Sequence, residues 1–126
     1  MIATLLRGLI GLIGTLSTLL ALRIWSAPVQ TAANLGLSGE GLLGHASLRA
    51  DLAGFFGAAG VLSLAAAVRN DRKLLTAPLI MIGLALSGRI LTLGLEGVTQ
   101  PQIQPLVIEA VLLVLLAAGR RNLGNR

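Results

Sequence analysis

Charged side chains inside apolar segments are the residues of this sequence best suited to chemistry. Arg89 stands between the runs MIGLALSG and ILTLGL. An arginine near the centre of a bilayer costs at least about 2.5 kcal/mol, so Arg89 is expected to face inward and to be paired. A buried guanidinium orients anions and stabilises developing negative charge, and a neighbouring carboxylate transfers protons. These residue types therefore point to an intramembrane polar site.

The same segment continues the polar pattern toward its C-terminal end. Thr92 and Glu96 follow Arg89 at i+3 and i+7, which places all three on one face of a helix. A carboxylate at a helix C-terminus is disfavoured by the helix dipole, so Glu96 also needs a cation. Arg23 or Arg49 is expected to supply it.

Six charged residues are expected to converge in one half of the protein: Arg23, Arg49, Asp51, Arg89, Glu96 and Glu109. In this hypothesis Asp51 and Glu109 act as acid and base and Arg89 as the electrophilic stabiliser, while Arg23, Arg49, Thr92, Glu96 and His45 contact the ligand. Simpler interpretations stay open. Asp51 and Glu109 lie near expected helix N-termini, which favour carboxylates. Arg23 and Arg49 can extend to lipid headgroups, and His45 can be an ordinary loop residue.

The elements that must position these residues are apolar helices. The chain has 126 residues, 55% hydrophobic and only 12% charged, so the polar surface of a soluble domain is missing. Four apolar segments, at about 2–24, 47–68, 74–96 and 103–119, approach the roughly 20 residues of a spanning helix. The expected fold is all-α, a single domain over 1–126 that forms a four-transmembrane-helix bundle. The first segment is expected to be a retained helix and not a signal peptide, and the fourth is expected to start before Pro105.

The distribution of basic residues predicts the topology. Seven of the ten lie in Arg7, RNDRK at 69–73 and RRNLGNR at 120–126. Because basic loops stay in the cytoplasm, both termini are expected to be cytoplasmic. The loop 25–46 then faces outward, and SAPVQTAANLG predicts a short amphipathic helix in it, with Ser26 as N-cap, Pro28 in the first turn and Gly36 as the stop.

Glycine spacing predicts which helices are neighbours. Gly8, Gly11 and Gly14 repeat every third residue, and the segment 54–60 repeats the pattern with three more glycines. Small residues let helix backbones approach closely in lipid, so the first and second apolar helices are expected to pack together. Glycine is also simply common in membrane helices.

Composition excludes several kinds of site. There is no cysteine, so disulfide and thiol redox chemistry are excluded, and the single histidine excludes a bis-histidine haem within one chain. No cofactor and no metal are expected, because three arginines already compensate the carboxylates. The net charge of +5 falls in short runs between apolar segments, which argues against nucleic-acid binding.

Three motifs carry a resemblance to a known family. The runs SLRADLAGFFGAAG, SGR around Arg89 and PLVIEAVLLVLL with Glu109 resemble a bacterial family of small four-helix membrane proteins classed as a domain of unknown function. The resemblance covers nearly the whole chain and implies a multi-pass protein of the bacterial inner membrane. It draws attention to Arg49, Asp51, Arg89 and Glu109 but implies no activity. A more distant similarity to DoxX-like proteins adds little, since their thiol chemistry has no cysteine here.

Three functions are compatible with these features. The first is a pocket for a small amphiphilic or lipid-like ligand, such as an isoprenoid, with or without acid–base chemistry of an isomerase or hydrolase type. The second is a non-catalytic accessory or structural subunit of a membrane complex, in which the same charges join helices. The third is a proton-coupled transporter, which would need a homodimer to form a path.

Overall fold

The computed structural model describes residues 1–124 and consists of helices joined by short connections. The four long helices are α1 (Ile2–Ser26), α4 (Ala53–Arg69), α5 (Thr76–Glu96) and α6 (Gln100–Asn122). The shorter elements are α2 (Pro28–Asn34), α3 (Gly41–Ser47), a π-helical turn η1 (Leu48–Leu52) and a 3-10 turn η2 (Arg72–Leu75). No strand occurs in this part of the chain. The all-α prediction is confirmed.

Four stretches are long and apolar enough to cross a membrane: Ile2–Ser26, Gly41–Arg69, Arg72–Glu96 and Gln100–Asn122. The expected four helices are therefore present, and the second and fourth begin earlier than expected. The second begins at Gly41, because α3 runs into η1 and α4 without a break. The fourth starts before Pro105, as expected, and begins at Gln100. There Thr99 and Gln102 form a capping box that supplies acceptors for free backbone N–H groups.

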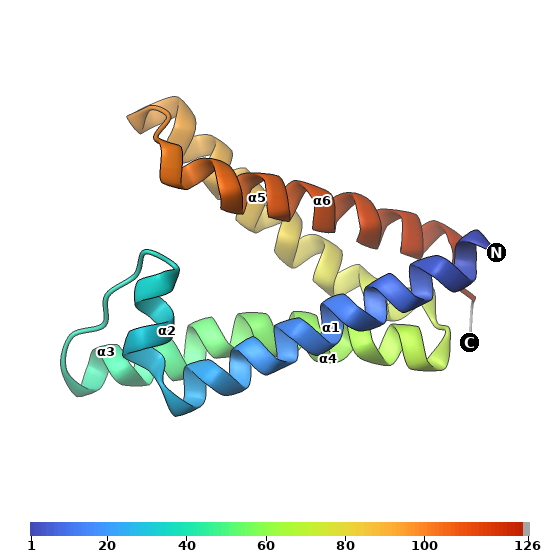
Figure 1. Ribbon diagram of the computed structural model, residues 1–126, viewed down its shortest axis with the longest axis horizontal. Helices are drawn as coiled ribbons and strands as arrows, with labels where there is room; N and C mark the ends of the chain where they lie inside the picture. Colours follow the sequence, from blue (N-terminus) through green and yellow to red (C-terminus); the bar gives the residue numbers. More distant parts are fainter. Residues whose placement is uncertain (125–126) are drawn as a thin grey trace.

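The long helices form two pairs. Figure 1 shows α1 lying beside α4 and α5 lying beside α6. The two pairs are close together at the end where both chain termini lie, which we call the terminal end. They diverge toward the opposite end, where α2, α3 and the α5–α6 turn are found, which we call the distal end. The molecule is thus an open arrangement of two hairpins.

The α1–α4 pair is built around two glycines. A Cβ atom added to Gly14 would lie 2.5 Å from Leu64 N, and one added to Gly60 would lie 2.6 Å from Thr18 N. The backbones therefore touch at this crossing, as small residues permit in membrane helices. The prediction that these helices are neighbours is confirmed. The outermost glycines of the two series, Gly8 and Gly54, face open space instead.

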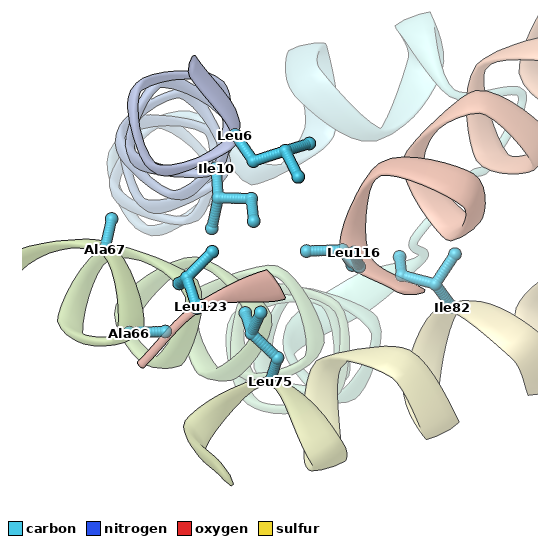
Figure 2. Packing of buried hydrophobic residues seen from close by; sticks show 8 residues of the cluster. All are labelled: Leu6, Ile10, Ala66, Ala67, Leu75, Ile82, Leu116 and Leu123. Carbon is cyan, nitrogen blue, oxygen red and sulfur yellow. The ribbon is translucent and has the colours of Figure 1, made fainter. Parts of the chain in front are cut away.

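The largest hydrophobic core lies at the terminal end and joins the two hairpins. Figure 2 shows its buried members: Leu6, Ile10, Ala66, Ala67, Leu75, Ile82, Leu116 and Leu123. A second cluster of buried residues, including Ile24, Ala32 and Leu48, fixes α2 and η1 against α1. Elsewhere large apolar side chains are exposed along every long helix, among them Leu84 and Val114. Such surfaces require an apolar solvent, which agrees with a membrane location.

The basic segments come together at the terminal end. Arg7 donates from Nε to the carbonyl oxygen of Ala67 at 2.9 Å, near the C-terminus of α4. The backbone N–H of Gly124 donates to Asn70 Oδ1 at 3.0 Å, which holds Gly124 against the α4–η2 turn. The grouping that underlies the topology prediction is therefore present, although Arg126 lies outside the described residues.

The first distal loop contains the expected short helix with a different start. Ser26 is the last residue of α1 and donates its hydroxyl proton to the carbonyl oxygen of Arg23, so it is not the N-cap. Ala27 takes that position, and Pro28 opens α2 as expected. The helix ends at Asn34, and Gly36 follows with a positive φ of 77°. Pro28, Thr31 and Ala32 are buried, so α2 packs onto the protein.

Candidate functional site

The central feature of the site is an ion pair between α5 and α6. Arg89 Nε lies 2.7 Å from Glu109 Oε2. Arg89 is seven residues before the last residue of α5, and Glu109 is nine residues after the first residue of α6. At about 1.5 Å per residue, both lie about 11–14 Å along their helices from the distal turn. Two antiparallel helices therefore bring the charges to one depth, and the expected pairing of Arg89 is found.

The two partners differ in exposure. The side chain of Glu109 is 15% exposed, whereas that of Arg89 is 44% exposed. A guanidinium has five N–H donors, and within residues 1–124 Arg89 uses only the one on Nε. Arg89 was expected to face inward, but nearly half of its side chain is exposed. In an apolar surrounding its remaining donors require an acceptor.

A small cavity adjoins the guanidinium. Its volume is about 60 Å³, enough for a small polar group or a few water molecules. The lining residues come from α5 and α6: Arg89, Thr92, Leu93, Gln102 and Leu106. Thr92 donates its hydroxyl proton to the carbonyl oxygen of Gly88 at 3.0 Å, which leaves its oxygen able to accept. The cavity thus combines a cation with an apolar wall.

Gln102 was not among the predicted site residues. Its Oε1 accepts the backbone N–H of Thr99 at 2.8 Å, so its amide N–H₂ group is the part free to donate. The motif Thr99-x-x-Gln102 is a capping signature, and it would have indicated both the helix start and the fixed position of this side chain. With Arg89, it gives the cavity two donors and makes it suited to a carboxylate, phosphate or carbonyl oxygen.

Arg49 and Trp25 form a separate, reciprocal contact. Arg49 Nε donates to the carbonyl oxygen of Trp25 at 3.0 Å, and Trp25 Nε1 donates to the carbonyl oxygen of Arg49 at 3.0 Å. The expected pairing of Arg49 or Arg23 with Glu96 is not seen: Glu96 is the exposed last residue of α5, and no ion pair joins it to a described residue. Arg49 therefore ties the end of α1 to η1.

This contact gives a testable expectation. Replacing Arg49 with methionine removes one charge-assisted hydrogen bond at an exposed position, so the free energy of unfolding should fall by about 1 kcal/mol. Because Trp25 is the only tryptophan, its fluorescence emission should shift in the same variant. Arg23→Met is the control, since its exposed side chain donates no hydrogen bond within residues 1–124. Unchanged Trp25 emission in Arg49→Met would contradict the contact.

The remaining predicted residues lie elsewhere. Asp51 is on η1 and lines an open hollow of about 400 Å³ beside α3, together with Glu40. That hollow shares no lining residue with the cavity at Arg89. His45 is half-buried in α3 and lines neither. The structure thus brings together Arg89, Glu109 and Thr92 and does not join the other charges to them, because the hairpins that carry them diverge. Within the described chain, no three acidic or histidine side chains form a group that could hold a metal ion.

Comparisons with known proteins add no identity. The chain matches no family model, no curated protein and no solved structure at a significant level. The resemblance to a bacterial four-helix family stays a prediction, and the function must be argued from the geometry at Arg89 and Glu109.

Proposed function

We propose that this protein is a small multi-pass membrane protein that binds an anionic, lipid-like amphiphile through Arg89. One observation carries the proposal: an arginine inside an apolar span is paired with Glu109 at 2.7 Å, yet 44% of its side chain is exposed beside a cavity. One carboxylate contact leaves most of its donors unused. An anionic group from a ligand would satisfy them at a depth that water reaches with difficulty.

The exposure of Arg89 favours binding over a purely structural pair. A pair that only fastens two helices in an apolar surrounding is stable when the remaining donors of its cation also have acceptors. Here the acid is shielded and the cation is partly open, with Thr92 and Gln102 beside it. The acid–base hypothesis has less support, because Asp51 and Glu109 belong to different hairpins and Asp51 lines a separate hollow. We therefore propose binding and assign no catalytic step.

The alternative is an accessory subunit of a membrane complex. Its support is the distal half of the α5–α6 hairpin, where Ile90, Leu91, Leu95 and Val98 are exposed. A partner helix could cover these side chains, and so could lipid. In either case, the basic residues at the terminal end support cytoplasmic termini, and with that orientation the cavity would lie in the outer half of the membrane, which the bacterial resemblance identifies as the inner membrane.

Native mass spectrometry of the purified protein with dodecanoate tests the proposal. Arg89→Met should weaken binding of dodecanoate at least about tenfold, because a charge-assisted hydrogen bond contributes about 1.5–3 kcal/mol. Arg121→Met is the matched control: it removes an exposed arginine at the terminal end and should leave binding unchanged. Equal affinity in wild type and Arg89→Met would contradict the proposal, as would an equal loss in both variants.

A further inference from the structure

An apolar groove between the two hairpins is not accounted for by the site at Arg89. Its volume is about 290 Å³, and all four long helices line it. Ile82 and Leu116, which belong to the large core, form its floor near the terminal end. Leu20 and Ile108 line it further toward the distal end. The groove is therefore closed by the core at one end and extends along the space where the hairpins begin to separate.

The lining excludes a polar occupant. Apart from two serines, every lining side chain is apolar. Ser17 donates its hydroxyl proton to the carbonyl oxygen of Phe56 at 2.8 Å, and Ser63 is 1% exposed. A water molecule needs two to four polar partners, and the groove does not offer them. An occupant must therefore be a hydrocarbon.

The dimensions of the groove fit a single hydrocarbon chain. The groove follows α1 from Ile13 to Leu20 and α6 from Leu116 to Ile108, which at about 1.5 Å per residue is about 11–12 Å. Its volume is at the lower limit of small-molecule sites, which span about 300–1,000 Å³. A helix of a second copy is about 10 Å across with its side chains, so a helix as long as the groove would need several times the volume of the groove. One acyl or isoprenoid chain fits.

Helix periodicity connects this groove to the ion pair. Arg89 follows Ile82 by seven residues on α5, and Glu109 precedes Leu116 by seven residues on α6. Seven residues are nearly two turns, so each charged residue lies on the same helix face as the floor residue, about 10 Å nearer the distal end. Arg89 and Glu109 therefore lie near the level of the distal end of the groove, although neither of them lines it.

From this arrangement we propose that the ligand is a single-chain anionic amphiphile, such as a long-chain carboxylate, whose head contacts Arg89 and whose tail lies in the groove with its end at Ile82 and Leu116. The inference rests on the proposed function for the head and extends it to the tail. The head lies about 11 Å along α5 from its distal end, and the tail runs from there toward the terminal end, which is the direction in which the acyl chains of the distal leaflet run.

Site-resolved photo-crosslinking tests the tail position. The probe is dodecanoate with a diazirine on its terminal carbon, added to the full chain in detergent and mapped by peptide mass spectrometry. Adducts are expected on Ile82, Leu116 and Ser63. Adducts confined to outward positions such as Leu84 and Val114 would show a tail in the surrounding lipid or detergent and would overturn the inference.

Two variants fill the groove, and one matched variant does not. Ala59 lines the groove, whereas Ala58 lines a different hollow between α1 and α4. Ala59→Phe should lower the yield of adducts on the floor residues Ile82 and Leu116 about tenfold, because the new ring occupies the position of the tail. Ala58→Phe should leave these adducts unchanged. Leu112→Trp fills the groove from α6 and replaces Ala59→Phe if that variant does not fold. Equal floor adducts in all three variants would overturn the inference.

Arg89→Met separates failure of the inference from failure of the proposed function. Loss of dodecanoate binding in Arg89→Met, with wild-type adducts only on outward residues, would leave the head site intact and overturn the tail position. Floor adducts that persist undiminished in Arg89→Met would show a hydrocarbon site without a head contact, and would overturn the proposed function and the joint site together. Floor adducts that fall about tenfold in Arg89→Met support both.

Discussion

Replacing Gly60 with alanine is expected to lower the free energy of unfolding by about 3 kcal/mol, at the upper end of the usual effect of overpacking. The added Cβ would lie 2.6 Å from both the backbone nitrogen and the hydroxyl oxygen of Thr18, and 2.9 Å from the carbonyl oxygen of Gly14. Two of these atoms are backbone atoms of α1, so a change of side-chain rotamer cannot make room. The helices must separate, and the packing that fixes the first hairpin is lost.

The matched control is Gly54→Ala, in the same helix α4. Nothing lies within 4 Å of a Cβ built at Gly54. Alanine is the better helix former by about 1 kcal/mol, so this variant should be neutral or slightly more stable. Unfolding of both proteins by SDS in the same micelles gives the comparison. The difference in stability between the two variants is the test: equal stability would mean that α1 and α4 do not cross at Gly14 and Gly60.

Local sequence signals were sufficient for most helix positions. Apolar segment lengths located the four long helices, and Pro28 correctly marked the start of the short helix. The predicted helix bounds were wrong where the helix extends beyond its apolar run. Gly41–Ser47 is helical with Leu42 and Leu43 exposed, and Gln100 begins α6 because of a capping box. Backbone hydrogen bonds and caps determine such ends, and a count of apolar residues does not include them.

The composition of the candidate site was only partly predictable. The expected cost of an arginine in an apolar span predicted a partner for Arg89, and a partner is present, but this reasoning did not identify it as Glu109. The expected convergence of six charges assumed a closed bundle, in which equal depth implies proximity. The structure has two hairpins that diverge, so Asp51 and Arg49 are at the distal end of one and Arg89 is within the other. The angle between hairpins depends on packing at Ile10, Leu75 and Leu116, which no local pattern encodes.

A double-mutant cycle on Arg89 and Glu109 is expected to show coupling of about 1–3 kcal/mol in the free energy of unfolding. Arg89→Met leaves a shielded carboxylate without its cation, because Glu109 is only 15% exposed. Glu109→Gln leaves an arginine whose side chain is 44% exposed and can turn toward headgroups. Arg89→Met should therefore be the more destabilising single change, and the double variant should lose less than the sum. Additive losses would show that the pair contributes nothing in the folded protein.

The same variants separate a binding site from a structural pair, because Glu109 and an anionic ligand share one guanidinium and repel each other there. In Glu109→Gln the charge that opposes the ligand is gone while Arg89 remains, so dodecanoate should bind as tightly as in wild type or up to about tenfold more tightly. Arg89→Met should lose binding. If the pair is only structural, both variants should instead lose affinity for dodecanoate to a similar extent, since each would disturb the same contact between α5 and α6. Parallel losses of binding that follow the losses of stability would therefore favour the accessory-subunit alternative over a ligand site at Arg89.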